Sequence, residues 1–324
     1  MTPLMTVGLP VYNSMPYLPE TMDSLFSQSF RDFEILAVVD DCKDGSVEYM
    51  ESLRDPRLRI LRQPKGGLVP ALNLMLREAS TPWLVRQDTD DIAYPNRLER
   101  MARAIQEHPD AGMFYSLAEY YPKEKSLGLF RCTRGTPDEL RAIAESGLLL
   151  SFCHPSVVLS RAKTLEIGGY DASLHVEDVD LWCRMALHYP IHFVPEVLLG
   201  YRHNASSLTA NNLHRAQLEL LYDQYLLLSR LNHWTPLPFS AVRDLLEPLV
   251  SKRDLEAKEH LRNVNMMMAK SAYVRACFYA LRSLLASPSY FLSRLRDEFA
   301  SSRPITNGVD PGFFLNRKEQ FWQA

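Results

Sequence analysis

The chain has 324 residues, of which 46% are hydrophobic and 23% are charged, with a net charge of -3 and a pI near 6.3. This composition is typical of a globular protein that is long enough for two domains, or for one large domain with an appendage. The slightly acidic balance argues against a nucleic-acid-binding protein, because the affinity of such proteins usually depends on a basic surface.

Residues 1–116 alternate between two hydrophobic periods. The continuous apolar run FEILAVV (33–39) is typical of a strand buried on both faces, whereas Leu18, Met22 and Leu25 recur at helical spacing. Tight strand–helix alternation predicts a parallel sheet covered by helices on both faces. The expected strands are 4–12, 33–39, 57–61, 82–87 and 111–116, and the expected helices begin near 14 and 46 and span 66–80 and 95–108.

The remainder of the chain is less regular and then becomes helical. Residues 117–204 show no sustained period, and from about residue 208 helical spacing predominates. We expect helices at 213–231, 255–286 and 290–299, a break between helices at 235–242, and a loosely ordered tail from 303 to 324.

The expected helix at 255–286 alternates apolar and basic side chains over its second half. We expect this face to dock against the preceding domain or against a second subunit in a homodimer. Peripheral contact with an anionic membrane surface is the alternative, because basic amphipathic helices lie on such surfaces. The apolar members are Tyr273, Cys277, Leu281, Leu284 and Leu285, and the basic members are Lys270, Arg275 and Arg282.

Several sequence features predict a cytoplasmic protein. The five cysteines are odd in number and scattered without a CxxC pair, which is typical of reduced thiols rather than of a disulfide framework or a zinc site. The segment MTPLMTVGLPVYN lacks the basic start and long apolar run of a signal peptide. No run of 18 uncharged apolar residues is present, so we expect no membrane span.

Two acidic clusters, DDCKD (40–44) and QDTDD (87–91), follow two of the expected strands. Ligands of parallel α/β sheets bind beyond the carboxyl ends of the strands. Two carboxylates about 4 Å apart repel each other by roughly 4 kcal/mol near a protein surface, so such a cluster is either splayed into water or held together by a cation. Mg²⁺ and Mn²⁺ typically bind one or two carboxylates together with substrate phosphates. We therefore expect Asp88 and Asp90 to hold such a cation on a diphosphate, with Asp91 supporting the loop.

Other acidic or nucleotide-binding motifs fit less well. DDCKD matches the DDxxD pattern of prenyl-diphosphate synthases, but there the motif lies on a helix, and here it follows a strand. QDTDD lacks the glycine and the spacing of a calcium-binding hand. No GxGxxG follows the first strand, and no GxxxxGK[ST] is present, which argues against dinucleotide-binding and P-loop proteins.

With these motifs in this order, the chain resembles the family 2 glycosyltransferases of GT-A fold. The resemblance runs from Thr6 to about Thr209 and implies an α/β, Rossmann-like nucleotide-diphospho-sugar transferase domain at 1–210. Its nucleotide-binding part would span about 1–116 and its acceptor part about 117–210, followed by a helical C-terminal region at 211–324. The matching segments are TVGLPVYNSMPYLPETMDSLFSQSF, EILAVVDDCKDGS, GGLVPALNLMLREA, WLVRQDTDDIAYPNRL, HPSVVLSR and GGYDASLHVEDVDLWCRM.

The resemblance implies roles for the residues at the strand ends. The donor would be a nucleotide-diphosphate sugar, expected to be UDP-linked, and the cofactor Mn²⁺ or Mg²⁺. Asp88 and Asp90 correspond to the DxD pair of the family, and His203 would be a third metal ligand or a phosphate contact. The segment VDDCKDGS is one residue shorter than the usual VDDGSTDGT, which leaves the contacts of Asp41 and Asp44 open. The expected donor-binding residues are Pro10, Tyr12, Asp40 or Asp41, Lys65, Gly66, Arg86 and Asp88.

HVEDVDLW (175–182) resembles the acidic catalytic motif of the family. Asp178 would be the general base that deprotonates an acceptor hydroxyl, which implies single displacement with inversion. Glu177 and Asp180 would support it, Trp182 would line or buttress the acceptor cleft, and the segment that contains His154 would border it. The acceptor would be a glycan or a lipid-linked molecule, at family level in surface polysaccharide or lipopolysaccharide synthesis. The alternatives are a non-catalytic sugar-nucleotide-binding subunit of a glycan-assembly complex and a nucleotidyltransferase.

Overall fold

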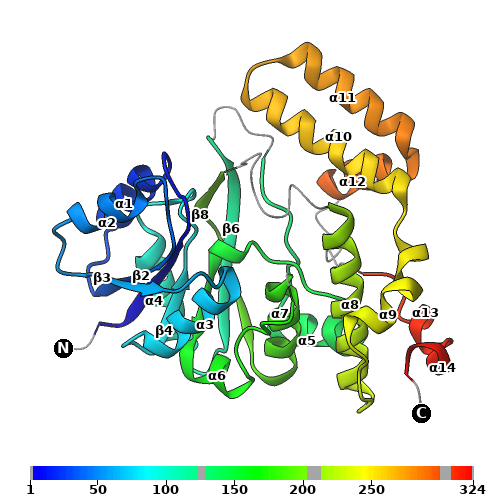
Figure 1. Ribbon diagram of the computed structural model, residues 1–324, viewed down its shortest axis with the longest axis horizontal. Helices are drawn as coiled ribbons and strands as arrows, with labels where there is room; N and C mark the ends of the chain where they lie inside the picture. Colours follow the sequence, from blue (N-terminus) through cyan, green and yellow to red (C-terminus); the bar gives the residue numbers. More distant parts are fainter. Residues whose placement is uncertain (1–2, 123–127, 175, 203–212, 300–307, 323–324) are drawn as a thin grey trace.

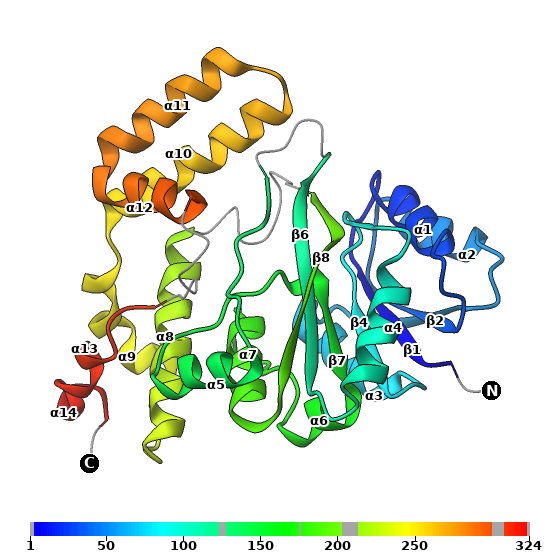
Figure 2. The same ribbon diagram turned by 180° about the vertical axis from the view of Figure 1, so that it is seen from behind.

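The computed structural model describes residues 3–122, 128–174, 176–202, 213–299 and 308–322. Figures 1 and 2 show one central sheet with helices on both faces, and further helices that follow it in the chain. The sheet has eight strands in the order β3-β2-β1-β4-β7-β6-β8-β5. It therefore continues well beyond the strands that the first half of the sequence predicts.

The first four strands of this order run parallel, as the strand–helix alternation predicts. In β2, Ile35 and Ala37 face one hydrophobic cluster while Leu36 and Val38 face the other, so the strand is buried on both sides. The strands are β1 (Met5–Val11), β2 (Phe33–Asp40), β3 (Leu58–Gln63) and β4 (Trp83–Arg86), and the helices between and after them are α1 (Leu18–Phe26), α2 (Ser46–Ser52), α3 (Leu68–Glu78) and α4 (Arg97–Glu107).

The other half of the sheet is mixed, so the expectation of a purely parallel sheet is wrong there. Strand β7 (Val157–Ser160) is antiparallel to both β4 and β6 (Met113–Tyr121), and the short β5 (Ile92–Ala93) is antiparallel to β8 (Ile191–Arg202). The 3-10 turn His154–Ser156 feeds β7 from the edge at which β6 ends. Hydrophobic periodicity is the same for either strand direction, so the sequence pattern carried no signal for this reversal.

Regular structure also fills the segment that the sequence pattern left irregular. Helix α5 (Pro137–Glu145) begins with a complete capping box between Thr136 and Glu139, a readable signature of a helix start. Helix α6 (Arg161–Glu166) leads from β7 toward α7 (Glu177–His188). Helix α7 begins at Glu177, within the acidic motif HVEDVDLW, and places its apolar side chains in the core on one face of the sheet.

The C-terminal tail is ordered from residue 308 to residue 322, so the expectation of a loose tail is wrong there. Helix α8 (Leu213–Leu231) packs against α7, and Phe314, Phe321 and Trp322 are buried against α8. The Trp322 indole Nε1 donates a hydrogen bond to Ser229 Oγ at 2.8 Å. Three buried aromatic side chains are enough to fix a short tail. The tail helices are α13 (Gly312–Leu315) and α14 (Lys318–Phe321).

The helices between residues 252 and 299 gather at one end of the molecule (Figure 1). The expected helix at 255–286 is two helices, because the chain turns at Ser271, whose φ is 56°. Within the described residues, no helix has the length and apolar character needed to cross a membrane. Helix α9 (Phe239–Leu246) begins within the expected break, continues past its end and packs against α8. It is followed by the 3-10 turn Glu247–Leu249, α10 (Lys252–Ala269), α11 (Tyr273–Ala286) and α12 (Pro288–Phe299).

Candidate active site

The carboxyl ends of four adjacent parallel strands bring the expected donor-binding residues to one edge of the sheet. Tyr12 follows β1 and is 56% exposed. Asp41 follows β2, Lys65 follows β3, and Asp88 follows β4. Pro10 lies in β1 itself, one residue before its end, and is partly buried. Strand order alone therefore gathers these side chains from the first 88 residues.

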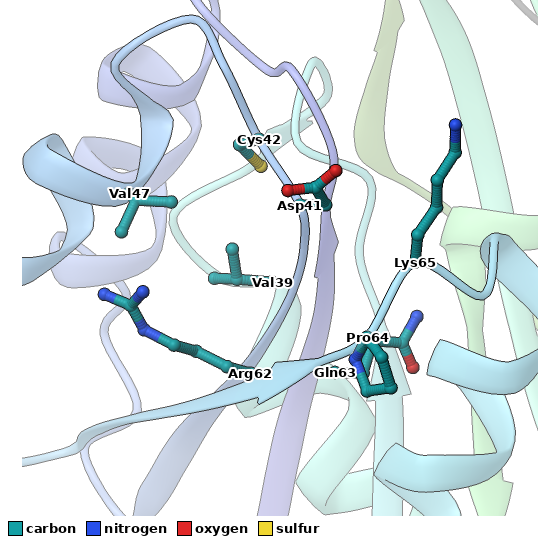
Figure 3. A pocket seen from close by; sticks show the side chains of 8 residues that line it. All are labelled: Val39, Asp41, Cys42, Val47, Arg62, Gln63, Pro64 and Lys65. Atoms are coloured by element: carbon teal, nitrogen blue, oxygen red, sulfur yellow. The ribbon is translucent and has the colours of Figure 1, made fainter.

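A pocket of about 290 Å³ opens at this edge. Figure 3 shows it between the segment that follows β2 and the end of β3 with the loop after it. Asp41 and Lys65 contribute one acidic and one basic side chain, both at positions expected to bind the donor. The lining consists of Val39, Asp41, Cys42, Val47, Arg62, Gln63, Pro64 and Lys65.

The two neighbouring aspartates after β2 have different surroundings. Asp40 is 5% exposed, and its two carboxylate oxygens accept the backbone N–H groups of Gly66 at 3.0 Å and Gly67 at 2.8 Å. These hydrogen bonds tie the end of β2 to the loop before α3. They therefore fix the backbone next to Lys65. Asp41 is exposed, which makes it the better placed of the two to meet a ligand.

Asp44 joins the loops after β1 and β2. Its Oδ2 accepts the backbone N–H of Met15 at 2.8 Å, and its Oδ1 accepts the hydroxyl of Ser46 at 2.6 Å. Cys42 takes part in the same junction, since its Sγ donates to the Val11 carbonyl at 3.3 Å. Burial raises the pKa of this thiol, so Cys42 has the character of a packing residue rather than of a nucleophile.

The turn after β4 carries three carboxylates with three different environments. Asp88 Oδ1 accepts a hydrogen bond at 2.6 Å from the buried guanidinium of Arg86. Asp90 is partly exposed. Asp91 is fully buried, and its Oδ1 accepts the backbone N–H of Arg202 at 2.7 Å. Burial, reinforced by repulsion from Asp88 and Asp90, raises the pKa of Asp91 well above its ordinary value.

This donor set suits a divalent cation that is held largely by its substrate. Within the described ranges, no three or more Asp, Glu, His or Cys side chains gather as a ligand set. Two carboxylates completed by phosphate oxygens are, however, the usual protein contribution to a Mg²⁺ site, and Asp88 and Asp90 provide them. The repulsion from Asp88 and Asp90, which adds to the effect of burial on the pKa of Asp91, is what a bound cation would relieve. The third expected ligand, His203, lies outside the described residues.

The first residues of α7 form the second half of the site. Asp178 is partly exposed, and its Oδ1 accepts the backbone N–H of Val179 at 2.9 Å. Burial raises the pKa of Asp178 to about 6. Glu177 is 5% exposed, and burial together with repulsion from Asp178 raises its pKa to about 8. Asp88 also raises the pKa of both carboxyls while Arg86 lowers it, so the turn after β4 and the start of α7 lie close enough to interact electrostatically.

His154 and Trp182 lie beneath this acidic pair. His154 Nε2 is 2.9 Å from the hydroxyl of Tyr170, and its Nδ1 is 3.8 Å from Glu177 Oε1. Burial lowers the pKa of His154 well below its ordinary value, so the ring is neutral. The fully buried Trp182 meets the His154 ring edge-on, with ring centroids 5.5 Å apart. Trp182 therefore has the position of a buttress rather than of a cleft-lining residue.

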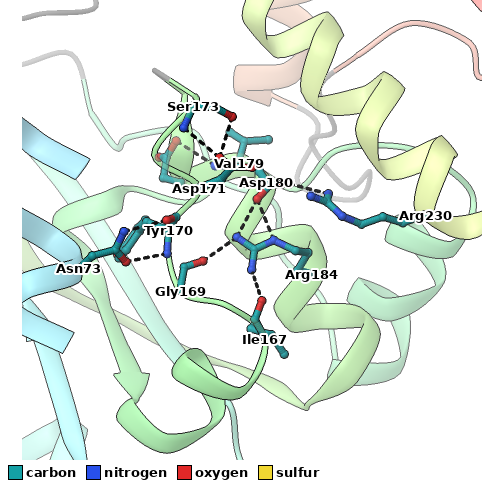
Figure 4. A network of polar contacts seen from close by, with 11 residues as sticks. Asn73, Ile167, Gly169, Tyr170, Asp171, Ser173, Val179, Asp180, Arg184 and Arg230 are labelled. Atoms are coloured by element: carbon teal, nitrogen blue, oxygen red, sulfur yellow. Dashed lines mark hydrogen bonds and ion pairs between the residues drawn. The ribbon is translucent and has the colours of Figure 1, made fainter. Parts of the chain in front are cut away.

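Helix α7 is held in place from both sides, as Figure 4 shows. Arg184 donates to Asp180 Oδ2 and to the carbonyl oxygens of Ile167 and Gly169, each at 2.7 Å. On the opposite side, Arg230 from α8 donates to Asp180 Oδ1 at 2.5 Å. The preceding loop is held through a reciprocal pair of hydrogen bonds between Asn73 and the backbone of Tyr170.

Two arginines that organise the acidic turn were missed by sequence reasoning. Arg97 is fully buried and donates to Gln87 Oε1 and to the carbonyl oxygens of Arg86 and Pro155. Arg202 donates from Nε to the Asp90 carbonyl oxygen at 2.7 Å. The position of Arg202 beside His203 in YRHN was a usable signal, but nothing in the pattern around Arg97 separates it from an exposed helical arginine.

Comparison with known sequences identifies the family. The sequence profile of Glycosyl transferase family 2 matches residues 6–167, which is half of the chain. An uncharacterized glycosyltransferase of Rickettsia felis is 27% identical over 230 residues, covering 69% of this chain but only 38% of that protein. The glycosyltransferase GlyG of Streptococcus pneumoniae is 32% identical over 133 residues, covering 40% of this chain and 43% of GlyG.

Solved structures share the fold. S. aureus TarS 1-349 in complex with UDP-GlcNAc aligns with a TM-score of 0.55 at 16% identity, covering 88% of this chain and 92% of that one. The mannosyltransferase PcManGT from Pyrobaculum calidifontis, in complex with GDP-Man and Mn²⁺, aligns with a TM-score of 0.52 at 19% identity, covering 94% and 82%. The mixed α/β architecture with C-terminal helices is therefore of GT-A type, as expected. The chain belongs to glycosyl transferase family 2.

Proposed function

We propose that the chain transfers a sugar from a nucleotide-diphosphate donor, expected to be a UDP-sugar, to a hydroxyl of a glycan or lipid-linked acceptor, with inversion. The observation that carries this proposal is that two acidic elements, the turn after β4 and the start of α7, lie close enough to Arg86 and to each other to interact electrostatically. The turn with Asp88 and Asp90 suits a diphosphate and its cation, and Asp178 at the start of α7 lies near that turn. One element can hold a leaving group while the other accepts a proton.

The donor would lie along the carboxyl edge of the sheet. Asp41 and Lys65 line the pocket there, where a carboxylate can accept the N–H and O–H groups of a base or ribose, and an ammonium can meet phosphate. Asp88 and Asp90 would hold Mn²⁺ or Mg²⁺, which supplies electrostatic stabilisation to the departing diphosphate when bound. The comparison structures with UDP-GlcNAc, and with GDP-Man and Mn²⁺, support this donor class.

Asp178 would accept the proton of the acceptor hydroxyl. A pKa of about 6 keeps this carboxylate ionised at neutral pH and makes it a stronger base than an ordinary aspartate. Glu177, with a pKa of about 8, is protonated at neutral pH and suits a supporting role as a hydrogen-bond donor. One general base together with a cation-stabilised leaving group fits one-step displacement with inversion.

The test is transfer and donor hydrolysis with a panel of UDP- and GDP-sugars in the presence of Mn²⁺. Asp178→Asn should reduce turnover by at least about a hundredfold while UDP binding by calorimetry stays within about twofold of wild type. The matched control is Asp171→Asn in the loop before α7, which should keep its activity. Full activity in Asp178→Asn would reject Asp178 as the base. Tight UDP-sugar binding without turnover on any acceptor would instead favour a non-catalytic subunit.

A further inference from the structure

Helix α11 presents an uninterrupted apolar stripe to solvent. Val274, Phe278, Leu281 and Leu285 are 86%, 55%, 55% and 72% exposed. Their spacings of four, three and four residues place them on one face of the helix. We call these four residues the α11 stripe. Single exposed apolar residues are ordinary, but a continuous row indicates an interaction surface.

The opposite face of α11 is the one that packs within the protein. Its buried residues, Ala276 and Ser283, are small, and Ser283 Oγ donates to the carbonyl oxygen of Ala257 in α10 at 2.8 Å. Helices α10 and α11 thus form a hairpin in which these small residues and a ring contact between His260 and Tyr279 lie at the interface, while the α11 stripe faces outward. The expectation that this apolar face docks against the preceding domain is therefore wrong for Leu281 and Leu285.

The arginines beside the α11 stripe indicate which kind of surface it binds. Arg275 and Arg282 each follow a stripe residue, both are exposed, and α11 contains no acidic residue. The Arg282 guanidinium lies 5.8 Å from the centre of the Phe278 ring. Two α11 helices packed face to face would bring these arginines together without a carboxylate on either helix to pair with them. An anionic phospholipid surface accepts both the arginines and the apolar row.

The position of the hairpin relates this surface to the candidate active site. Figures 1 and 2 both show α10 and α11 at the end of the molecule where β6 and β8 finish, which is the carboxyl edge of the parallel strands. We propose that α11 lies on the surface of an anionic membrane, with the α11 stripe in the interfacial layer and Arg275 and Arg282 at the lipid headgroups. This arrangement holds the candidate active site near the bilayer. It rests on the surface of α11 and not on the proposed reaction.

The experiment is flotation of the full chain with vesicles of phosphatidylcholine alone or mixed with phosphatidylglycerol. Wild type should float with the mixed vesicles and much less with the neutral ones. Phe278→Gln/Leu285→Gln should lower the apparent affinity by about tenfold or more, and Arg275→Gln/Arg282→Gln should remove the preference for anionic lipid. The matched control is Leu165→Gln/Leu315→Gln, which changes two apolar residues of 39% and 40% exposure outside α11 and should float as wild type does.

Two results would overturn the proposal. The first is wild type that fails to float with either kind of vesicle. The second is a wild-type dimer in sedimentation equilibrium that becomes monomeric in Phe278→Gln/Leu285→Gln, with no effect of that variant on flotation. The unfolding midpoint and the rate of donor hydrolysis of Phe278→Gln/Leu285→Gln should equal those of wild type. Equal values show that the variant lost membrane binding and kept its fold and its active site.

Discussion

Arg230 of α8 and Asp180 of α7 form a hydrogen-bonded ion pair at 2.5 Å, between an arginine that is about one-third exposed and a fully buried carboxylate. Asp180 lies two residues after Asp178, on the same helical turn. This ion pair therefore links a C-terminal helix to the helical turn that carries the candidate base Asp178. Arg184 binds the other oxygen of Asp180 and the loop before α7, so the helix start is held from two directions.

Substitution of Arg230 should impair positioning more than folding. In Arg230→Met, Asp180 keeps Arg184 and loses only one partner, so we expect a loss of about 1 kcal/mol in the free energy of unfolding. Because α7 gains freedom at its first turn, kcat should fall about tenfold while KM for the donor changes little. Steady-state kinetics and urea unfolding measure the two effects.

Arg215→Met is the matched control for Arg230→Met. It removes an arginine from the same helix that pairs with Glu219 and is half exposed, and it should leave kcat unchanged. Partial recovery of kcat in Arg230→Lys would support a positioning role. An Arg230→Met enzyme with wild-type kcat at reduced stability would show that the contact is structural only.

Much of the site could be predicted because its parts follow directly after strands. The end of an apolar run can be recognised in a sequence. Because β2 and β4 are parallel, the residues that follow them, Asp41 and Asp88, must lie at the same edge of the sheet. The pairings that refine this picture join distant positions, such as Asp40 with Gly66 and Asp180 with Arg230. No periodicity reports them, because they depend on which helices and loops meet in three dimensions. The direction of β7 was hidden for the same reason.

The pH dependence of transfer should follow the ionisation of Asp178. Its pKa is raised to about 6 by burial, and the base must be deprotonated to accept a proton. The logarithm of kcat/KM should therefore rise with a slope of one below pH about 6 and level off above it. A profile measured from pH 4.5 to 8.5 in constant ionic strength tests this. An acid limb near pH 4 would contradict the raised pKa.

Glu177 should make the ligand-free protein less stable as the pH rises. Its pKa is raised from 4.5 to about 8 by burial, so the folded state binds more protons than the unfolded state between these values. The free energy of unfolding must then fall with increasing pH across that window. Glu177→Gln removes this contribution and should stabilise the protein by more than about 1 kcal/mol at pH 8 relative to pH 5.

Chemical unfolding at both pH values, in EDTA, measures the effect of Glu177→Gln. Glu107→Gln, at the exposed end of α4, is the control. It should change the free energy of unfolding by the same amount at pH 5 and at pH 8. Equal effects of Glu177→Gln at pH 5 and pH 8 would argue against a raised pKa for Glu177.

Asp90 and Asp91 of QDTDD should respond differently to removal of their charge. Asp90→Asn should abolish the additional thermal stabilisation that Mn²⁺ gives to the UDP complex, because it removes a ligand from a site with few protein donors. Asp91→Asn keeps an Oδ1 acceptor for the backbone N–H of Arg202 and should preserve that Mn²⁺ effect. Thermal shift with UDP, with and without Mn²⁺ or EDTA, distinguishes them. If Asp91→Asn lost the Mn²⁺ effect and Asp90→Asn kept it, Asp91 rather than Asp90 would be the metal ligand.

The ordered tail should contribute strongly to stability. Trp322 is 4% exposed, its ring stacks on Tyr225 with centroids 4.8 Å apart, and its Nε1 donates to Ser229 Oγ. Trp322→Ala should therefore cost about 3–5 kcal/mol in the free energy of unfolding, through the lost burial and the cavity left against α8. Leu315→Ala, a 40% exposed residue of α13, should cost less than about 1 kcal/mol.

If Trp322→Ala and Leu315→Ala lowered the free energy of unfolding by the same small amount, the tail would not unfold cooperatively with the rest of the protein. A large loss in Trp322→Ala has a further consequence, because Tyr225 and Ser229 lie on the same helix as Arg230. Loosening the tail would then free the helix that supports Asp180, and kcat should fall together with stability. Measuring kcat well below the unfolding temperature separates this coupling from simple loss of folded enzyme.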